Sequence, residues 1–271
     1  MRVVRRAELL AAAILALFVA LWLLPFWAVL MTSLKDDTEA RLTLPVAPPT
    51  RPTLYPFFRA FDLMKQGLFN SLVFTVLATI FSTVIGSLNG YFLAKIRYSD
   101  ILILLLSFGI FIPYHAVAIP LLIVTSRLGL YNSLLGLTLV HTAYGIPICT
   151  LFFTSFLSEL PQSLIDAARV DGADETTIYT RVVLPVSWPA FVVTAVFQFT
   201  SIWNDFLFGL ILTQGVNQPA SVVLANLLGT TAAEWNTQMA GTFLYAFPVV
   251  LVYFLLGKYL VRGYLAGAIK A

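Results

Sequence analysis

The sequence predicts an all-α, polytopic membrane protein with six transmembrane helices. Hydrophobic residues make up 59% of the 271-residue chain and charged residues only 11%, whereas about 25% of a typical soluble domain is charged. A membrane-spanning helix needs about 20 consecutive, mainly apolar residues. Six stretches with at most one acidic or basic residue meet this length, namely Leu9–Leu34, Gly67–Ala94, Ile101–Ser126, Leu128–Ser158, Val182–Leu212 and Trp235–Gly257.

The first stretch follows a basic N-terminus, MRVVRR, a pattern that secretory signal peptides share. Such peptides have an apolar region of about 7–15 residues and then a small-residue cleavage site. Here the uncharged run is 26 residues long and no such site closes it. We therefore expect a retained transmembrane helix.

Residues 1–66 are predicted to form this first helix and an external loop. Prolines exclude a continuous helix through the first half of the loop. Its second half, Leu54–Met64, has apolar and aromatic residues at roughly helical spacing, and is expected to form a short interfacial helix. The loop is either a docking surface for an external partner or an ordinary solvated connection, and its residues fit both.

The basic residues near helix ends set the expected orientation, because cytoplasmic loops carry an excess of Lys and Arg. With the N-terminus inside, ten basic residues fall on the inner side and six on the outer side. Both termini and residues 159–181 are then cytoplasmic. Residues 67–271 would hold a core of five helices, a cytoplasmic loop at 159–185 and a cytoplasmic C-terminal tail.

The most informative segment is the polar stretch 166–189, DAARVDGADETTIYTRVVLPVSWP, between two long apolar stretches. It resembles the EAA loop of ATP-binding-cassette (ABC) importer permeases, roughly E-A-A-x-x-D-G-A, then an aromatic residue and I-x-L-P-x-x-x-P. Asp166 replaces the leading Glu, which keeps the charge on a shorter side chain. The resemblance implies a type I ABC importer permease fold, with a cytoplasmic EAA coupling loop. It assigns contact with an ATPase to Asp166, Ala167, Ala168, Asp171, Gly172, Ala173, Tyr179, Leu184 and Pro185.

We expect residues 159–185 to fold as a helix-turn-helix knob. Leu164–Val170 would form a short helix with Ser163 as its N-cap, and Asp174 would cap a second helix. Gly172 permits a left-handed turn between the two helices. Pro185 would end the cytoplasmic segment and start the fifth span.

The chain has no G-x-x-x-x-G-K-[ST] phosphate loop, the motif that cradles nucleotide phosphates in many ATPases. It is therefore predicted not to be an enzyme and to bind no cofactor, with ATP hydrolysis in another polypeptide. The resemblance implies that two ATPase subunits bind ATP and Mg and drive this chain through residues 164–185. It also implies a homologous permease, an extracytoplasmic sugar-binding protein, and a multi-pass location in a bacterial or archaeal inner membrane.

Other segments resemble the carbohydrate-uptake subfamily of these permeases. They are Asn70-Ser71, the run WNDFL at 203–207 and the tail RGYLAGAIK at 262–270. The relevant subunit is similar to the maltose-system G permease, and the details are most like glucose/mannose-type permeases. In that class the C-terminus reaches between the ATPase subunits, which implies an ATPase interface at Tyr264, Leu265, Ala266, Gly267 and Lys270.

Asp205 is the acid within the predicted fifth span, and an ionisable residue in a span is a functional candidate. With Trp203 and Asn204 it offers an aromatic face and polar partners for sugar hydroxyls. Alternatively it accepts hydrogen bonds from helix backbone, or lies near the outer interface. The two histidines, His115 and His141, are expected to be neutral packing residues, because no second carboxylate lies near them in sequence. A tentative substrate pathway consists of Tyr114, His115, Trp203, Asn204 and Asp205.

The main alternative function is an ion-coupled secondary transporter of small polar solutes. Such carriers hold several intramembrane ionisable groups, often in duplicated halves, and this sequence has one such carboxylate and no visible repeat. No Cys/His spacing indicates a metal site, and Cys149 is the single cysteine. The basic residues are scattered at segment ends, which argues against nucleic acid as a partner.

Overall fold

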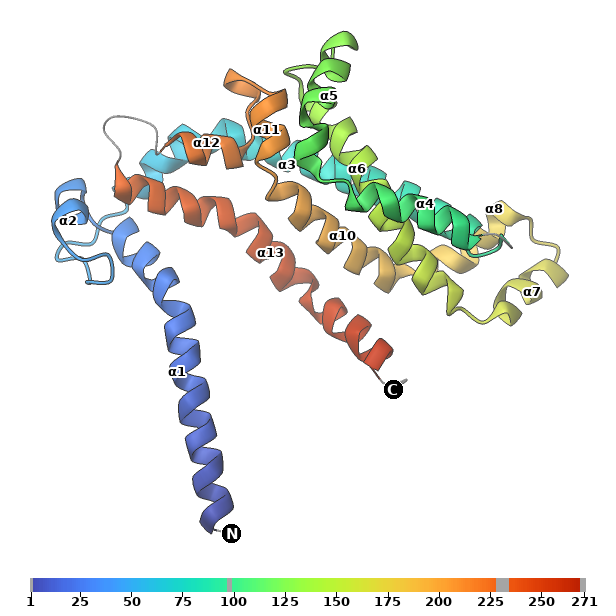
Figure 1. Ribbon diagram of the computed structural model, residues 1–271. Coiled ribbons are helices and arrows are strands. Elements are labelled where there is room, and N and C mark those ends of the chain that lie inside the picture. The colour runs from blue at the N-terminus through green and yellow to red at the C-terminus, as the bar shows by residue number, and fades with distance from the viewer. Residues whose placement is uncertain (1, 97–98, 228–233, 269–271) are drawn as a thin grey trace. The chain divides into compact units, whose positions relative to one another are not determined.

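The computed structural model describes residues 2–96, 99–227 and 234–268, and the regular structure within them is helical, as predicted (Figure 1). A π-helical stretch (Tyr179–Val183) and a 3-10 turn (Gly215–Asn217) accompany the α-helices. The α-helices are α1 (Arg2–Ser33), α2 (Asp37–Leu42), α3 (Tyr55–Leu93), α4 (Ser99–Phe111), α5 (Tyr114–Arg127), α6 (Leu134–Ser158), α7 (Gln162–Val170), α8 (Glu175–Ile178), α9 (Leu184–Val186), α10 (Trp188–Trp203), α11 (Leu207–Leu212), α12 (Ala220–Asn226) and α13 (Trp235–Ala268).

Within the described residues, four helices are long and apolar enough to cross a membrane, namely α3, α6 and parts of α1 and α13. Two further candidate spans are broken helices: α4 and α5 bend by 87°, and the run Glu175–Val186 bends by 73° against α10. Counting each bent pair as one span gives six, which is the predicted number. Each of these two spans thus consists of two helices that meet at a bend.

Proline explains the first break. Pro113 has φ −59° and ψ 124°, outside the helical region, and it lacks the backbone N–H that a continuing helix would use. A residue before a proline also avoids helical geometry. Ile101–Ser126 therefore forms two helices.

Three other helix boundaries differ from those predicted. α6 begins at Leu134 rather than Leu128, because Gly129 and Asn132 adopt positive φ and Ser133 then caps the helix. α10 ends at Trp203, and α11 is a separate helix. The expected interfacial helix at 54–64 is the beginning of the 39-residue helix α3.

The contacts divide the chain into two compact units, Met1–Lys65 with Val223–Ala246 and Gln66–Val222 with Phe247–Ala271. In the first unit the connection after α1 folds around Lys35, which is 0% exposed. Its ammonium donates to the Thr43 hydroxyl and the Leu44 carbonyl, both at 2.8 Å. A buried ammonium held by two acceptors indicates an ordered connection.

In the second unit, α3 and α6 approach closely at two glycines. A Cβ at Gly86 would collide with Cys149, and one at Gly90 would collide with Phe153. Small residues four apart on one helix face let the backbones of membrane helices approach. This contact holds α3 beside α6. One candidate site packs on both helices, and the other is lined in part by α6.

Candidate functional sites: a helical knob and a polar cavity

Residues 162–186 fold as a helical knob, as the sequence predicts. Gly172 follows α7 with φ +81°, and backbone hydrogen bonds of 3.0 Å run from its amide and the next one to carbonyls of α7. A left-handed glycine is a common way to end a helix. Asp174 then caps α8, because its carboxylate accepts from the Thr177 amide at 2.8 Å.

Two local expectations for the knob are wrong. Ser163 lies inside α7, whose N-cap residue is Pro161. Pro185 lies within a continuous helical run, and the bend occurs at Ser187, just before α10. The π-helical stretch ends at Val183, two residues before Pro185, and its wider turn relieves the clash that a proline ring makes with the preceding turn of an α-helix.

The knob is fastened to α3 by five residues, here called the seam. Ser87 and Tyr91 stand four residues apart and so share one face of the end of α3, and Lys95 lies in the turn just beyond the helix. Ser87 Oγ and the Tyr179 hydroxyl lie 2.6 Å apart, and the Tyr91 hydroxyl donates to Glu175 Oε2 at 2.8 Å. Lys95 Nζ contacts the same carboxylate oxygen and lies 3.6 Å from the Tyr91 ring centroid.

Three donors lower the pKa of Glu175 from its usual 4.5 to about 2: Lys95 first, then Tyr91, then Arg169. Arg169 donates from its guanidinium to Glu175 Oε1 at 3.0 Å. Because the carboxylate is half-exposed, solvent screens these charges. The seam therefore orients the knob more than it stabilises the fold.

Buried side chains reinforce the seam. Ile165 of α7, Ile178 of α8 and Val183 of the π-helical stretch share one apolar cluster with Tyr91 of α3 and Phe153 of α6. The knob thus rests on two long helices through a packed interior.

The outer face of α7 carries the residues of the EAA-like motif. Asp166, Ala167 and Asp171 are exposed, and Val170 is 87% exposed. The Asp166 carboxylate accepts hydrogen bonds from two side chains of its own helix, at 3.1 and 3.3 Å. Ala168 instead packs inward, against the apolar cluster. The outer face therefore offers a small apolar surface flanked by acids.

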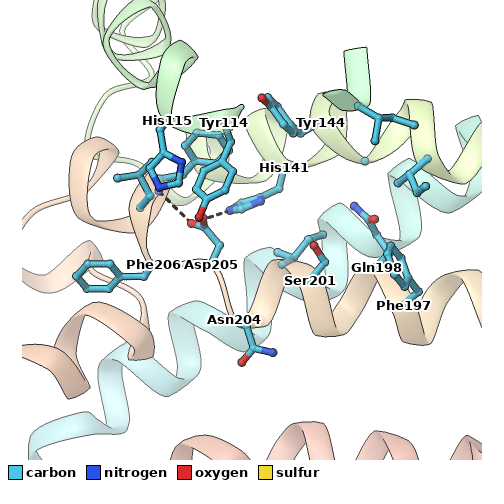
Figure 2. Close-up of a pocket in the computed structure, with 16 residues that line it drawn as sticks. Tyr114, His115, His141, Tyr144, Phe197, Gln198, Ser201, Asn204, Asp205 and Phe206 are labelled. Atoms are coloured by element: carbon cyan, nitrogen blue, oxygen red, sulfur yellow. Dashed lines mark hydrogen bonds and ion pairs between the residues drawn. The ribbon is translucent and has the colours of Figure 1, made fainter. Parts of the chain in front are cut away.

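A separate cavity of about 700 Å³ lies in the second unit, lined mainly by α5, α6 and the region from α10 to α11 (Figure 2). Asp205 is the one acid among its lining residues, and the lining includes no Lys or Arg. Its polar lining residues are Tyr114, His115, His141, Tyr144, Gln198, Ser201, Asn204 and Asp205.

Asp205 lies in the turn between α10 and α11 rather than inside a helix. Its Oδ2 accepts from the amides of Phe208 at 3.1 Å and Gly209 at 3.2 Å. The Ser221 hydroxyl donates to its carbonyl at 2.7 Å. The structure thus shows the expected alternative in which Asp205 accepts hydrogen bonds from helix backbone, while a contact with substrate stays a prediction.

The imidazole of His141 approaches the carboxylate of Asp205 in the wall of the cavity (Figure 2). The imidazole is 5% exposed and stacks on Phe74, with ring centroids 5.4 Å apart. Its Nε2 lies 3.6 Å from Asp205 Oδ2 and makes no hydrogen bond in the described part of the chain. His141 was expected to be a packing residue, because no second carboxylate lies near it in the sequence, and so it was not placed in the predicted pathway. The sequence does hold a signal for this contact, because a histidine and a carboxylate both lie within predicted membrane spans.

The cavity brings together four of the five predicted pathway residues: Tyr114, His115, Asn204 and Asp205. Trp203 is placed elsewhere, because its ring is 1% exposed and stacks on Phe199 with centroids 5.7 Å apart. Successive helix residues point about 100° apart, so Trp203 faces the core where its neighbour Asn204 faces the cavity. In this structure Trp203 offers no face to a ligand.

The structure describes no side-chain contacts for the predicted tail residues. The side chains of Tyr264, Leu265 and Ala266 lie outside the described residues, as does Lys270, and Gly267 is described only by its helical backbone. Within the described ranges, no three His, Cys, Asp or Glu side chains gather closely enough to hold a metal ion.

Residues 78–265 match a family model described as "Binding-protein-dependent transport system inner membrane component". A probable ABC transporter permease protein of Pyrococcus horikoshii is 50% identical over 262 residues, which cover 95% of both chains. The xylose/arabinose import permease protein of Haloferax volcanii is 33% identical, covering 93% of this chain and 90% of the relative. The glucose import system permease protein of Saccharolobus solfataricus is 30% identical, covering 98% and 96%.

Among solved structures, a bacterial ABC transporter that imports the acidic polysaccharide alginate matches with a TM-score of 0.77 and 20% identity. The match covers 96% of this chain and 98% of that one. At this identity the similarity concerns the fold.

Proposed function

This chain belongs to the family of binding-protein-dependent transport system inner membrane components and has the fold of an ABC importer permease; from that premise we propose that it forms half of the translocation pathway of an ATP-driven sugar importer. Relatives that cover most of the chain are named import permeases for glucose and for xylose or arabinose, which supports a sugar as substrate. The resemblance at 203–207 and in the tail favours the glucose/mannose type.

The knob is the observation that carries the proposal. Ala167 and Val170, flanked by Asp166 and Asp171, suit a groove on an ATPase subunit. On the opposite side, the seam and the apolar cluster join the knob to α3 and α6. A movement of the ATPase would therefore reach long membrane helices through packed side chains rather than through a loose loop.

The proposed assembly has this chain paired with a homologous permease, two ATPase subunits and an extracytoplasmic sugar-binding protein in a bacterial or archaeal inner membrane. Both termini and the knob are cytoplasmic, and the connection between α1 and α3 is external. ATP and Mg bind to the ATPase subunits. Their closure draws the cytoplasmic ends of the permeases together, which turns the pathway outward while the binding protein releases sugar.

Replacing Val170 with Asp tests this proposal. A carboxylate in an apolar groove is costly, so Val170→Asp should lower co-purification of the ATPase at least about tenfold, the ratio for ~1.4 kcal/mol. Val216→Asp is the matched control, because Val216 is also exposed, at 75%, and lies in a turn away from the knob.

Uptake of glucose into proteoliposomes should require internal ATP and the ATPase subunits. Normal ATPase binding by Val170→Asp would refute the assignment of the knob as the docking site. Uptake driven by an ion gradient alone would instead support a secondary carrier.

A further inference from the structure

We propose that the cavity is a contact site for a neutral, polyhydroxylated solute, in which His141, Asp205, Gln198 and Ser201 are the hydrogen-bonding wall. The inference rests on the proposed function. It adds the residues that touch the sugar and a selection against acidic solutes.

The buried imidazole of His141 is the first observation. A histidine that serves only packing usually has its ring nitrogens satisfied, because an unpaired buried polar atom is unfavourable. His141 Nε2 has no hydrogen bond in the described chain and lies 3.6 Å from Asp205 Oδ2. A hydroxyl group both donates and accepts, so a sugar hydroxyl that displaces the contact between these two groups can donate to the carboxylate and bond the imidazole nitrogen, which is otherwise buried.

Two further polar side chains extend this wall along α10. Gln198 and Ser201 stand three residues apart and so share one side of α10, and Asp205 follows in the turn after that helix and lines the same cavity. Gln198 is 4% exposed and lines the cavity. A Cβ at Gly145 would collide with the Gln198 amide, so the glycine provides the space in which the amide lies.

The charge of the lining favours neutral solutes. Asp205 is its one acid, and the lining includes no Lys or Arg to pair with an anion. A second carboxylate brought here would meet Asp205 away from bulk water, where like charges repel strongly. Aromatic side chains from Tyr114, Tyr144 and Phe208 complete the lining and supply apolar surface for the C–H faces of a ring, as in other small-molecule sites.

Protection of a single cysteine from labelling tests the site in the purified complex of permeases and ATPases. Cys149 is the only cysteine of this chain, so Cys149→Ser combined with Ile148→Cys places one thiol on the cavity wall. A water-soluble thiol reagent is applied with D-glucose, D-xylose, L-arabinose or maltose, and with D-glucuronate as the acidic counterpart of glucose. Labelling of this chain is measured by mass spectrometry.

His141→Phe in that background removes the ring nitrogens and keeps an aromatic ring against Phe74. Thr142→Val is the matched control, because it removes an unpaired buried hydroxyl from the next residue of α6, outside the cavity lining. At least one neutral sugar should slow labelling, and His141→Phe should raise its half-protective concentration about tenfold or more, the ratio for one lost buried hydrogen bond. Thr142→Val should change it by less than about threefold, and D-glucuronate should protect at least about tenfold less well than D-glucose.

Equal protection in His141→Phe and Thr142→Val would overturn the role of His141, and equal protection by glucuronate would overturn the selection for neutral solutes. If no neutral sugar protects while the importer still takes up one of them with ATP, the cavity is not the contact site and the proposed function stands. If ATP drives uptake of none of these sugars, the proposed function fails, and this inference fails with it.

Discussion

Replacing Gly172 with Val tests whether the turn of the knob must keep its left-handed shape. Gly172 has φ +81°, and a Cβ built there meets nothing within 4 Å. The cost therefore lies in the backbone alone, at about 1–3 kcal/mol for an L-residue held in a sparsely populated region. If the turn relaxes instead, the two backbone hydrogen bonds that close α7 are weakened, at about 0.5–1.5 kcal/mol each. Either way the native knob becomes roughly ten- to a hundredfold less favoured.

Two readouts follow from this magnitude: co-purification of the ATPase and sugar-stimulated ATP hydrolysis. Gly172→Val should insert into the membrane normally but lose most of both, because the membrane helices are untouched. Gly172→Asn is the matched control, since Asn tolerates the left-handed region, and it should retain most coupling, with Gly172→Ala in between. Asp166→Ala leaves the turn unchanged and should weaken coupling less than Gly172→Val. Normal assembly and hydrolysis in Gly172→Val would refute the transmission role of the turn.

Four further predictions follow from other contacts. The pKa of Glu175 is lowered to about 2, so the stability that its carboxylate contributes is fully present above its unfolded pKa near 4.5 and is lost as the pH falls toward 2. Coupled hydrolysis should therefore show no titration of this group between about pH 5 and 8. Glu175→Gln or Tyr91→Phe should reduce hydrolysis a few-fold without changing insertion. Gly86→Leu should lower the thermal unfolding midpoint, since overpacking costs about 1–3 kcal/mol, and an unchanged midpoint would contradict the close contact of α3 with α6. Asp205→Ala should lower that midpoint more than Asp205→Asn, because Asn keeps an acceptor for the amides of α11 and a lost cap costs about 1 kcal/mol; equal midpoints would remove the capping role. Deleting Leu265–Ala271 should lower sugar-stimulated hydrolysis and leave insertion intact, and unchanged hydrolysis would rule out the tail as an ATPase contact.

Local features of the fold were readable in the sequence because they depend on neighbouring residues. Apolar runs of sufficient length predicted the spans, and the Gly172 turn and the Asp174 cap were predicted from residue types that suit those positions. The break at Pro113 was a local effect too, but a proline within an apolar run is also compatible with a kinked, continuous helix.

The tertiary structure decided which distant side chains meet. The hydrogen bond between Tyr91 and Glu175 joins residues 84 positions apart, and the approach of His141 to Asp205 depends on where α10 ends and how α6 is rotated about its axis. The burial of Trp203 beside the exposed Asn204 depends likewise on how α10 is rotated about its own axis. Hydropathy determined that these helices lie in a membrane, but in such apolar helices it leaves their rotation open. Packing at Gly86 and Gly90 and the hydrogen bonds to Asp205 fix how these helices are rotated, because close backbone contact and a satisfied carboxylate are each possible in few arrangements.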